Sequence, residues 1–291
     1  MVLYYFRSEY FMPIRDEQYP VIRETPCKTL LGKSGIGDYS LNCYGGCAHG
    51  CVYCYARFMQ RFHPHEEPWG AFVDVKANAV EALERQLHRA RPGHVFVSSA
   101  CDGWQPVERE RGLTRDCCRL LLRHGFQVNA LTKSALILRD LDIFTGSTAQ
   151  IGVTVTTLDQ RLASLWEPHA DPVEDRLRVL DAARAAGLKT SVMFGPLLPF
   201  LYDTYENIYA LLERAAALQV DAIWMDAFNP RPMVWEATSV LLDAEFPGLR
   251  ERYQRILFSA PVRTAYLTAL RGHIALASER LHLGNRVSAC I

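Results

Sequence analysis

The residues most suited to chemistry in this chain are three cysteines in one short segment. Cys47, Cys51 and Cys54 form a C-x3-C-x2-C array, and glycines stand among them at positions 45, 46 and 50. Thiolates are soft ligands that suit zinc and iron–sulfur clusters. Glycine lets the backbone turn tightly and bring N–H groups toward a cluster. The segment therefore predicts a metal or iron–sulfur site.

The number of cysteines separates two kinds of site. A structural zinc or an electron-transfer cluster normally has four protein ligands, whereas three ligands leave one metal position open for chemistry. Cys43 or His49 is the alternative fourth ligand, which would make the site a closed, non-catalytic iron–sulfur or zinc module. We expect Cys43 to be a buried cysteine of a strand instead, so an open site is the preferred interpretation.

A parallel sheet is the element that would position such a site. Apolar runs predict strands at 39–43, 94–99, 127–131, 151–155, 190–194 and 222–225, and helical patterns alternate with them at 81–89, 114–123, 140–144, 174–186 and 207–218. Repeated βα units indicate an α/β fold with helices over a parallel sheet. Six units are too few for a closed eight-fold barrel, so we predict a partial (β/α)6 barrel, with its site at the carboxyl ends of the strands.

The two ends of the chain do not follow this alternation. We predict an N-terminal extension at 1–30, a partial-barrel core at 31–235 and a C-terminal helical extension at 236–291, with helices near 250–258 and 264–281. The N-terminal extension is expected to cover the mouth or side of the barrel. Its aromatic residues suit either a peptide groove or packing against the barrel, and they are Tyr4, Tyr5, Phe6, Tyr10 and Phe11.

Composition limits the class of protein. The 291 residues are 49% hydrophobic, with 32 basic and 32 acidic side chains. This is typical of a globular protein, and it gives no general attraction to nucleic acid or to an anionic membrane. Apolar runs of about 20 residues and a secretory signal are absent from the sequence. Nine cysteines, an odd number crowded into one loop, favour metal binding over disulfides. We expect a cytoplasmic protein without a membrane segment.

Four stretches of the chain resemble the radical S-adenosylmethionine (SAM) superfamily, and within it the spore photoproduct lyase-like family. They are 45–57 (GGCAHGCVYCYAR), 101–108 (CDGWQPVE), 131–134 (LTKS) and 151–159 (IGVTVTTLD), and the resemblance spans about residues 30–235. An aromatic residue before the last cysteine belongs to the superfamily motif, and Tyr53 fills that position. The fold implied by the resemblance is a partial (β/α)6 barrel of the radical SAM type.

The resemblance also implies cofactors and their ligands. Cys47, Cys51 and Cys54 would hold three irons of a [4Fe–4S] cluster, and SAM would chelate the fourth. Residues expected to contact SAM are Tyr53 at the adenine, Lys133 at the methionyl carboxylate, and Thr154, Gly195 and Asn229 along the strand ends. The implied activity is reductive cleavage of SAM to methionine and a 5′-deoxyadenosyl radical, which abstracts hydrogen from a substrate. An electron donor such as flavodoxin or ferredoxin is the implied partner.

Cys101 is the catalytic candidate outside the cluster motif. It directly follows the second predicted strand of the barrel. In spore photoproduct lyase a cysteine of this region returns a hydrogen atom to the product radical, so the resemblance implies the same role for Cys101. The alternative is a small buried hydrophobe, which is the usual place of a free cysteine.

Two substrate classes fit the sequence. The first is a nucleobase, by analogy with the lyase, held in a basic and aromatic groove. The second is a ribosomal peptide, as for the splicease-like enzymes of this branch, which can require a small partner protein. The balanced charge of the chain suits a peptide at least as well as a nucleic acid.

Overall fold

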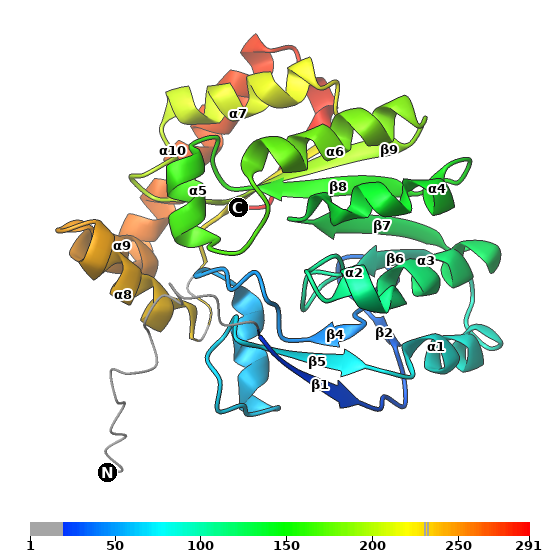
Figure 1. Ribbon diagram of the computed structural model, residues 1–291. Coiled ribbons are helices and arrows are strands. Elements are labelled where there is room, and N and C mark those ends of the chain that lie inside the picture. Colours follow the sequence, from blue (N-terminus) through cyan, green and yellow to red (C-terminus); the bar gives the residue numbers. More distant parts are fainter. Residues whose placement is uncertain (1–19, 230, 232) are drawn as a thin grey trace.

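The computed structural model describes residues 20–229, 231 and 233–291, and an eight-stranded sheet organises them (Figure 1). Its strand order is β11-β10-β9-β8-β7-β6-β3-β2. Six neighbouring strands run parallel in the order of the sequence, and they are β3 (Tyr39–Leu41), β6 (His94–Val97), β7 (Gln127–Thr132), β8 (Gln150–Val155), β9 (Lys189–Leu197) and β10 (Ala222–Ala227). β2 and β11 stand at the two ends of this order and do not pair with each other, so the described sheet is open. The predicted partial (β/α)6 barrel is confirmed.

Helical segments connect the parallel strands and cover the sheet (Figure 1). The predicted helices appear with shifts of a few residues at their ends. The connecting segments are η2 (Tyr55–Arg61), α1 (Ala79–Leu87), α2 (Glu108–Arg111), α3 (Leu113–Arg123), η3 (Ala135–Asp140), α4 (Leu141–Phe144), α5 (Gln160–Trp166), α6 (Val173–Ala185) and α7 (Tyr205–Ala217). β8 is buried along almost its whole length and is a nearly continuous apolar run, whereas β7 and β10 alternate between buried and half-buried residues.

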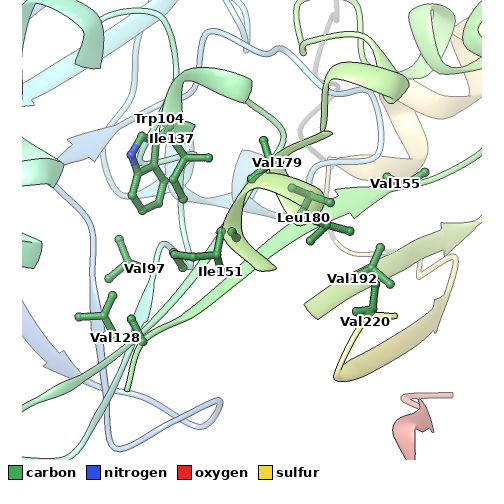
Figure 2. Close-up of a cluster of buried hydrophobic side chains, with 14 of the residues drawn as sticks. Val97, Trp104, Val128, Ile137, Ile151, Val155, Val179, Leu180, Val192 and Val220 are labelled. Carbon is green, nitrogen blue, oxygen red and sulfur yellow. The ribbon is translucent and has the colours of Figure 1, made fainter. Parts of the chain in front are cut away.

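The hydrophobic core lies between the sheet and these helices (Figure 2). Ile151 of β8 and Leu180 of α6 are both buried in it. Trp104, in the loop after β6, is fully buried, and its indole Nε1 donates to Asp140 Oδ2 at 2.9 Å. The core therefore includes the loops at the carboxyl ends of the strands and fixes their paths.

The ends of the chain add pairing that the sequence pattern did not predict. β1 (Val21–Thr25) runs parallel to β5 (Phe72–Lys76), and β4 (Tyr44–Gly45) joins β5 in a three-stranded sheet. β2 (Leu31–Lys33) and β11 (Val287–Ala289) extend the large sheet at its two edges, and η4 (Gly284–Arg286) precedes β11. These strands are only two to five residues long, so pairing rather than local pattern defines them.

The C-terminal segment is mainly helical, as predicted. α9 (Leu249–Phe258) and α10 (Ala260–Arg280) match the two predicted helices, whereas α8 (Val234–Glu245) was not predicted. The aromatic residues of the N-terminal extension lie outside the described residues. No described helix is long and apolar enough to cross a membrane.

Candidate active site

The three motif cysteines lie in the loop between β4 and η2. The light-blue helix of Figure 1 is η2, and it lies on the side toward which the arrows of β6, β7 and β8 point. Cys47 and Cys51 are buried and Cys54 is half-buried. Cys54 and Cys101 pack against a small apolar cluster that contains Cys47 together with Ala56, Trp69 and Phe72. The fold therefore gathers four thiols at the carboxyl end of the sheet.

Gly46 gives the loop a turn that no other residue would fit. Its φ of 73° lies in the left-handed region, and a Cβ there would come within 2.6 Å of the Phe72 ring and carbonyl oxygen. The Phe72 ring has no free side to retreat to, because His65 stacks on it at 3.8 Å between centroids. His65 is itself held by Asp74, with Nε2 and Oδ2 2.9 Å apart. The glycine thus lets the backbone before Cys47 approach β5.

The buried amide of Gln105 fixes the same loop from the β6 side. Its Oε1 accepts from the Ala48 N–H at 2.8 Å, and its Nε2 donates to the Gly46 carbonyl at 3.3 Å. Gln105 is fully buried, so water does not compete for these bonds. The backbone on both sides of Cys47 is therefore tied to the segment after β6.

Asp102 connects the ends of two strands. Its Oδ1 accepts from Thr132 Oγ1 at 2.6 Å, and its Oδ2 accepts from the backbone N–H of Lys133 at 2.7 Å. The His49 Nδ1 of the cysteine loop lies 3.4 Å from the same Oδ2. Burial lowers the pKa of His49, although the Asp102 charge opposes the shift, so the imidazole is neutral at pH 7.

Cys43 and His49, the two alternative fourth ligands, lie in different surroundings. Cys43 is fully buried within the large core cluster, which also contains Cys117, and the His49 ring lies against Asp102. Among the described residues, no three side chains of His, Cys, Asp or Glu converge on one position for a single ion. A [4Fe–4S] cluster does not require its ligands to converge on one position, because each cysteine binds a different iron.

Tyr53 belongs to a buried network at the end of β8. Its hydroxyl lies 3.0 Å from Thr156 Oγ1 and donates to Glu167 Oε1. The other oxygen of Glu167 pairs with Arg176 Nη1 at 2.6 Å, and both side chains are almost completely buried. Burial raises the pKa of Tyr53 well above its usual value, which keeps the phenol protonated as the donor. The network fixes the ring of Tyr53 beside the cysteine loop.

Lys133 faces this ring from the end of β7. Its Nζ lies 5.6 Å from the centroid of Tyr53. Burial disfavours the ammonium, but the interactions of Lys133 with Cys51 and Glu167 outweigh this effect and raise its pKa. Lys133 is therefore a cation at neutral pH, positioned between the cysteine loop and the Tyr53 network.

The remaining predicted SAM residues differ in their surroundings. Thr154 is buried in β8, and its carbonyl accepts from Arg176 Nη1 at 3.1 Å. The carbonyl of Gly195 in β9 accepts from Thr156 Oγ1 at 3.4 Å, so both residues adjoin the Tyr53 network. Asn229 is exposed after β10, and its carbonyl accepts from the Arg231 N–H at 2.9 Å.

Cys101 lies beside the cysteine loop. Its side chain is half-buried, and its Sγ lies 3.8 Å from Asn42 Oδ1. The same Asn42 oxygen accepts from the backbone N–H groups of Ser99 and Ala100, at 3.0 and 2.7 Å. Burial raises the pKa of the Cys101 thiol to about 12. The S–H bond is thus retained at neutral pH, and Asn42 fixes the loop that carries it.

Comparison with known families decides which class of site this is. The family model described as Radical SAM superfamily matches residues 41–215, which include the cysteine loop and the Tyr53 network. This chain belongs to the radical SAM superfamily.

Relatives of this radical SAM protein extend across archaea and bacteria. An uncharacterized protein of Methanocaldococcus jannaschii is 32% identical, over 57% of this chain and 62% of that protein. An uncharacterized protein of Mycobacterium tuberculosis is 29% identical, over 92% of this chain and 84% of that protein. The resemblance seen in the sequence is therefore confirmed at the level of the superfamily.

Solved structures share the fold over nearly the whole chain. Spore photoproduct lyase complexed with dinucleoside spore photoproduct matches with a TM-score of 0.65 at 11% identity, over 92% of this chain and 81% of that one. A double mutant of the same lyase with bound AdoMet and dinucleoside spore photoproduct gives 0.67 at 10% identity, with the same coverage. The lyase-like fold is thus confirmed, and identity this low carries no activity across.

The donor set of this radical SAM chain fits a [4Fe–4S] cluster. Three buried or half-buried thiols share one loop, and Gly46 holds the backbone before the first of them in a turn closed to side chains. Burial raises the pKa of all three thiols, that of Cys51 to about 12. Thiols must lose their protons to bind iron, so cluster binding would release a proton from each.

Several residues of the site carried no signal of their own in the sequence. Glu167 ends a helix and Arg176 lies within one, so each resembled an ordinary charged residue of a helix surface. Asp102 and Gln105 lie within the 101–108 stretch, but only their contacts reveal that they fix the cysteine loop. Contacts between segments far apart in the chain were needed to find all four.

Gly46→Ala is expected to destabilise the protein and Gly32→Ala to leave it nearly unchanged. The left-handed φ and the close approach to Phe72 should cost the Gly46 variant about 1–3 kcal/mol. A Cβ on Gly32 would meet nothing within 4 Å, and the φ there is not positive, so this variant should stay within about 0.5 kcal/mol. Urea unfolding of both variants measures the difference. Equal stabilities would show that the turn tolerates a side chain.

Proposed function

We propose that this protein cleaves SAM reductively at a [4Fe–4S] cluster and abstracts hydrogen from a substrate. The observation that carries the proposal is the arrangement of one loop. Its three motif thiols lie at the carboxyl end of a partial barrel, next to Lys133 and Tyr53. Three ligands leave one iron open, which is the requirement for chemistry at the metal.

Cys47, Cys51 and Cys54 would hold the cluster, each through its own iron. When bound, the cluster and SAM supply a one-electron cleavage that gives methionine and a 5′-deoxyadenosyl radical. The protein contributes binding, orientation and the exclusion of water. Gln105 and Asp102 hold the loop in place, so the thiols are presented without a large rearrangement.

Lys133 and Tyr53 would orient SAM. The cationic Nζ of Lys133 suits a carboxylate as a point charge. The ring of Tyr53 offers a face for adenine, and its hydroxyl is already engaged by Thr156 and Glu167. Thr154 and Gly195 would line the same pocket from β8 and β9, and Asn229 would do so from beyond β10.

Cys101 would return a hydrogen atom to the product radical. Its thiol packs against the cluster of residues around Cys47, and burial keeps it protonated. A thiol that stays in the S–H form is the state that hydrogen-atom donation requires. The role is that of a lyase-type donor, and the alternative is packing alone.

A nucleobase is the substrate class we favour, with a ribosomal peptide as the second. The shared fold with spore photoproduct lyase, whose structures hold a dinucleoside lesion, supports the first. No described feature favours a peptide groove. The electron would come from a flavodoxin- or ferredoxin-type donor, and the nine unpaired cysteines suit a reducing cytoplasm.

Loss of any motif cysteine should abolish the cluster. After anaerobic reconstitution the wild type should hold about four irons per chain. Cys47→Ala, Cys51→Ala and Cys54→Ala should each lose them, whereas Cys43→Ala and His49→Ala should retain them. Iron analysis with visible absorption measures this outcome. Loss of iron in Cys43→Ala or His49→Ala would point to a closed, four-ligand site.

Lys133→Ala should weaken SAM binding. Removal of a charged hydrogen bond to the carboxylate costs about 1.5–3 kcal/mol, or roughly a ten- to hundredfold rise in the dissociation constant. Lys189→Ala is the matched control, because Lys189 is exposed at the opposite end of β9. The dissociation constant of SAM is measured by equilibrium binding to the reconstituted wild type and to both variants. Equal affinity in the Lys133 variant and the wild type would remove Lys133 from the site.

Cys101→Ala should change the products rather than the cleavage of SAM. Cluster content, SAM cleavage and hydrogen abstraction should persist, while the substrate radical goes to side products because the returning hydrogen is missing. Cys118→Ala is the control for packing alone, since Cys118 is fully buried in α3, and it should lose only about 1 kcal/mol of stability. Mass spectrometry of the products formed from the substrate by the wild type and by each variant distinguishes the two roles. An unchanged product pattern in Cys101→Ala would end its role as donor.

A further inference from the structure

Arg57, three residues after the last motif cysteine, is a buried arginine. It belongs to η2, and only 9% of its surface is exposed. Its Nη2 donates to the Cys51 carbonyl at 3.1 Å. Its Nε is buried and has no hydrogen-bond partner in the described part of the protein. Buried polar groups are almost always paired, so this free N–H calls for an explanation.

The charge of Arg57 is also uncompensated. No carboxylate among residues 20–229, 231 and 233–291 pairs with it. Arg176 shows the usual arrangement, because Glu167 balances that buried arginine at 2.6 Å. An unpaired buried cation is costly, so the site is built for a negative group that completes it.

A second unpaired donor lies in the same place. The indole Nε1 of Trp69 is buried without a partner among the described residues. Trp69 packs in the apolar cluster that contains Cys47 and Ala56, the neighbour of Arg57. Arg57 and Trp69 therefore each have a buried N–H without a partner, and each contacts the cysteine loop or packs with one of its cysteines.

We infer that Arg57, assisted by Trp69, tunes the reduction potential of the [4Fe–4S] cluster by offering positive charge and N–H donors to its sulfur atoms. The inference rests on the proposed function. Reduction adds one electron from the external donor and makes the cluster more negative, while no bond to Arg57 forms or breaks. A nearby cation stabilises the reduced state more than the oxidised state, and hydrogen bonds to sulfur act in the same direction. Arg57 is thus a tuning residue and not a catalytic one.

The first test is the midpoint potential of the reconstituted cluster, from an anaerobic titration followed by electron paramagnetic resonance. Arg57→Met should lower the equilibrium constant for reduction at least tenfold, which is about 59 mV for one electron. Arg57→Lys keeps the charge, so its midpoint potential should lie between those of the wild type and Arg57→Met. Trp69→Phe should lower the potential by less than Arg57→Met does. Arg61→Met, an exposed arginine of the same helix, should match the wild type.

The second test uses the protein without its cluster. Arg57→Met should raise the melting temperature of the cluster-free chain, because it removes a buried charge that lacks a partner. Arg176→Met should lower that temperature, since it leaves Glu167 unpaired. If Arg57 had only a structural role, the cluster-free Arg57→Met chain would instead melt at a lower temperature than the cluster-free wild type.

The outcomes separate the two proposals. If the wild type assembles the cluster and Arg57→Met has the same midpoint potential, the proposed function stands and the role of Arg57 is overturned. A cluster-free Arg57→Met chain that melts below the wild type would also overturn it, even if that variant binds no iron. A wild type that assembles no cluster would overturn both.

Discussion

The structure depends on holding a loop of thiols against the open end of a parallel sheet. The buried carboxylate of Asp102 provides this attachment, because one side chain accepts from the Trp104 N–H in the loop after β6 and from the end of β7, and it faces His49 of the cysteine loop. Gln105 adds two further bonds from the same segment. Hydrogen bonds in a site without competing water are costly to break, so the loop is fixed before any cofactor arrives.

Charge at this end of the sheet is arranged in two ways. Glu167, Arg176 and Tyr53 form a closed network whose charges balance, and it holds a ring and a cation beside the loop. Arg57 and Trp69, which follow the cysteine loop in the chain, have buried donors without partners among the residues that the structure describes. The balanced network gives rigidity, whereas the unbalanced groups suit a negative group that is bound there.

The fold follows from the same requirement. Parallel strands end at one edge, so the segments after β6, β7, β8 and β9 meet there although they are far apart in the chain. The small sheet of β1, β5 and β4 supports the loop from the other side, through Phe72 beneath Gly46. The shared fold with spore photoproduct lyase shows that this scaffold serves a radical SAM enzyme of another sequence.

The sequence by itself determined the superfamily, the six parallel strands and the open barrel, because a local motif and apolar runs of buried strands are written in neighbouring residues. It did not predict β1, β2 or β11, since strands of three to five residues are defined by their partners, and it did not predict the helix α8. Only the tertiary structure decided that Asp102 and Gln105 hold the loop, that Glu167 pairs with Arg176, and that Arg57 has no such partner in the described part of the chain. Pairing between side chains is a property of segments brought together in space, and no local pattern of residues encodes it.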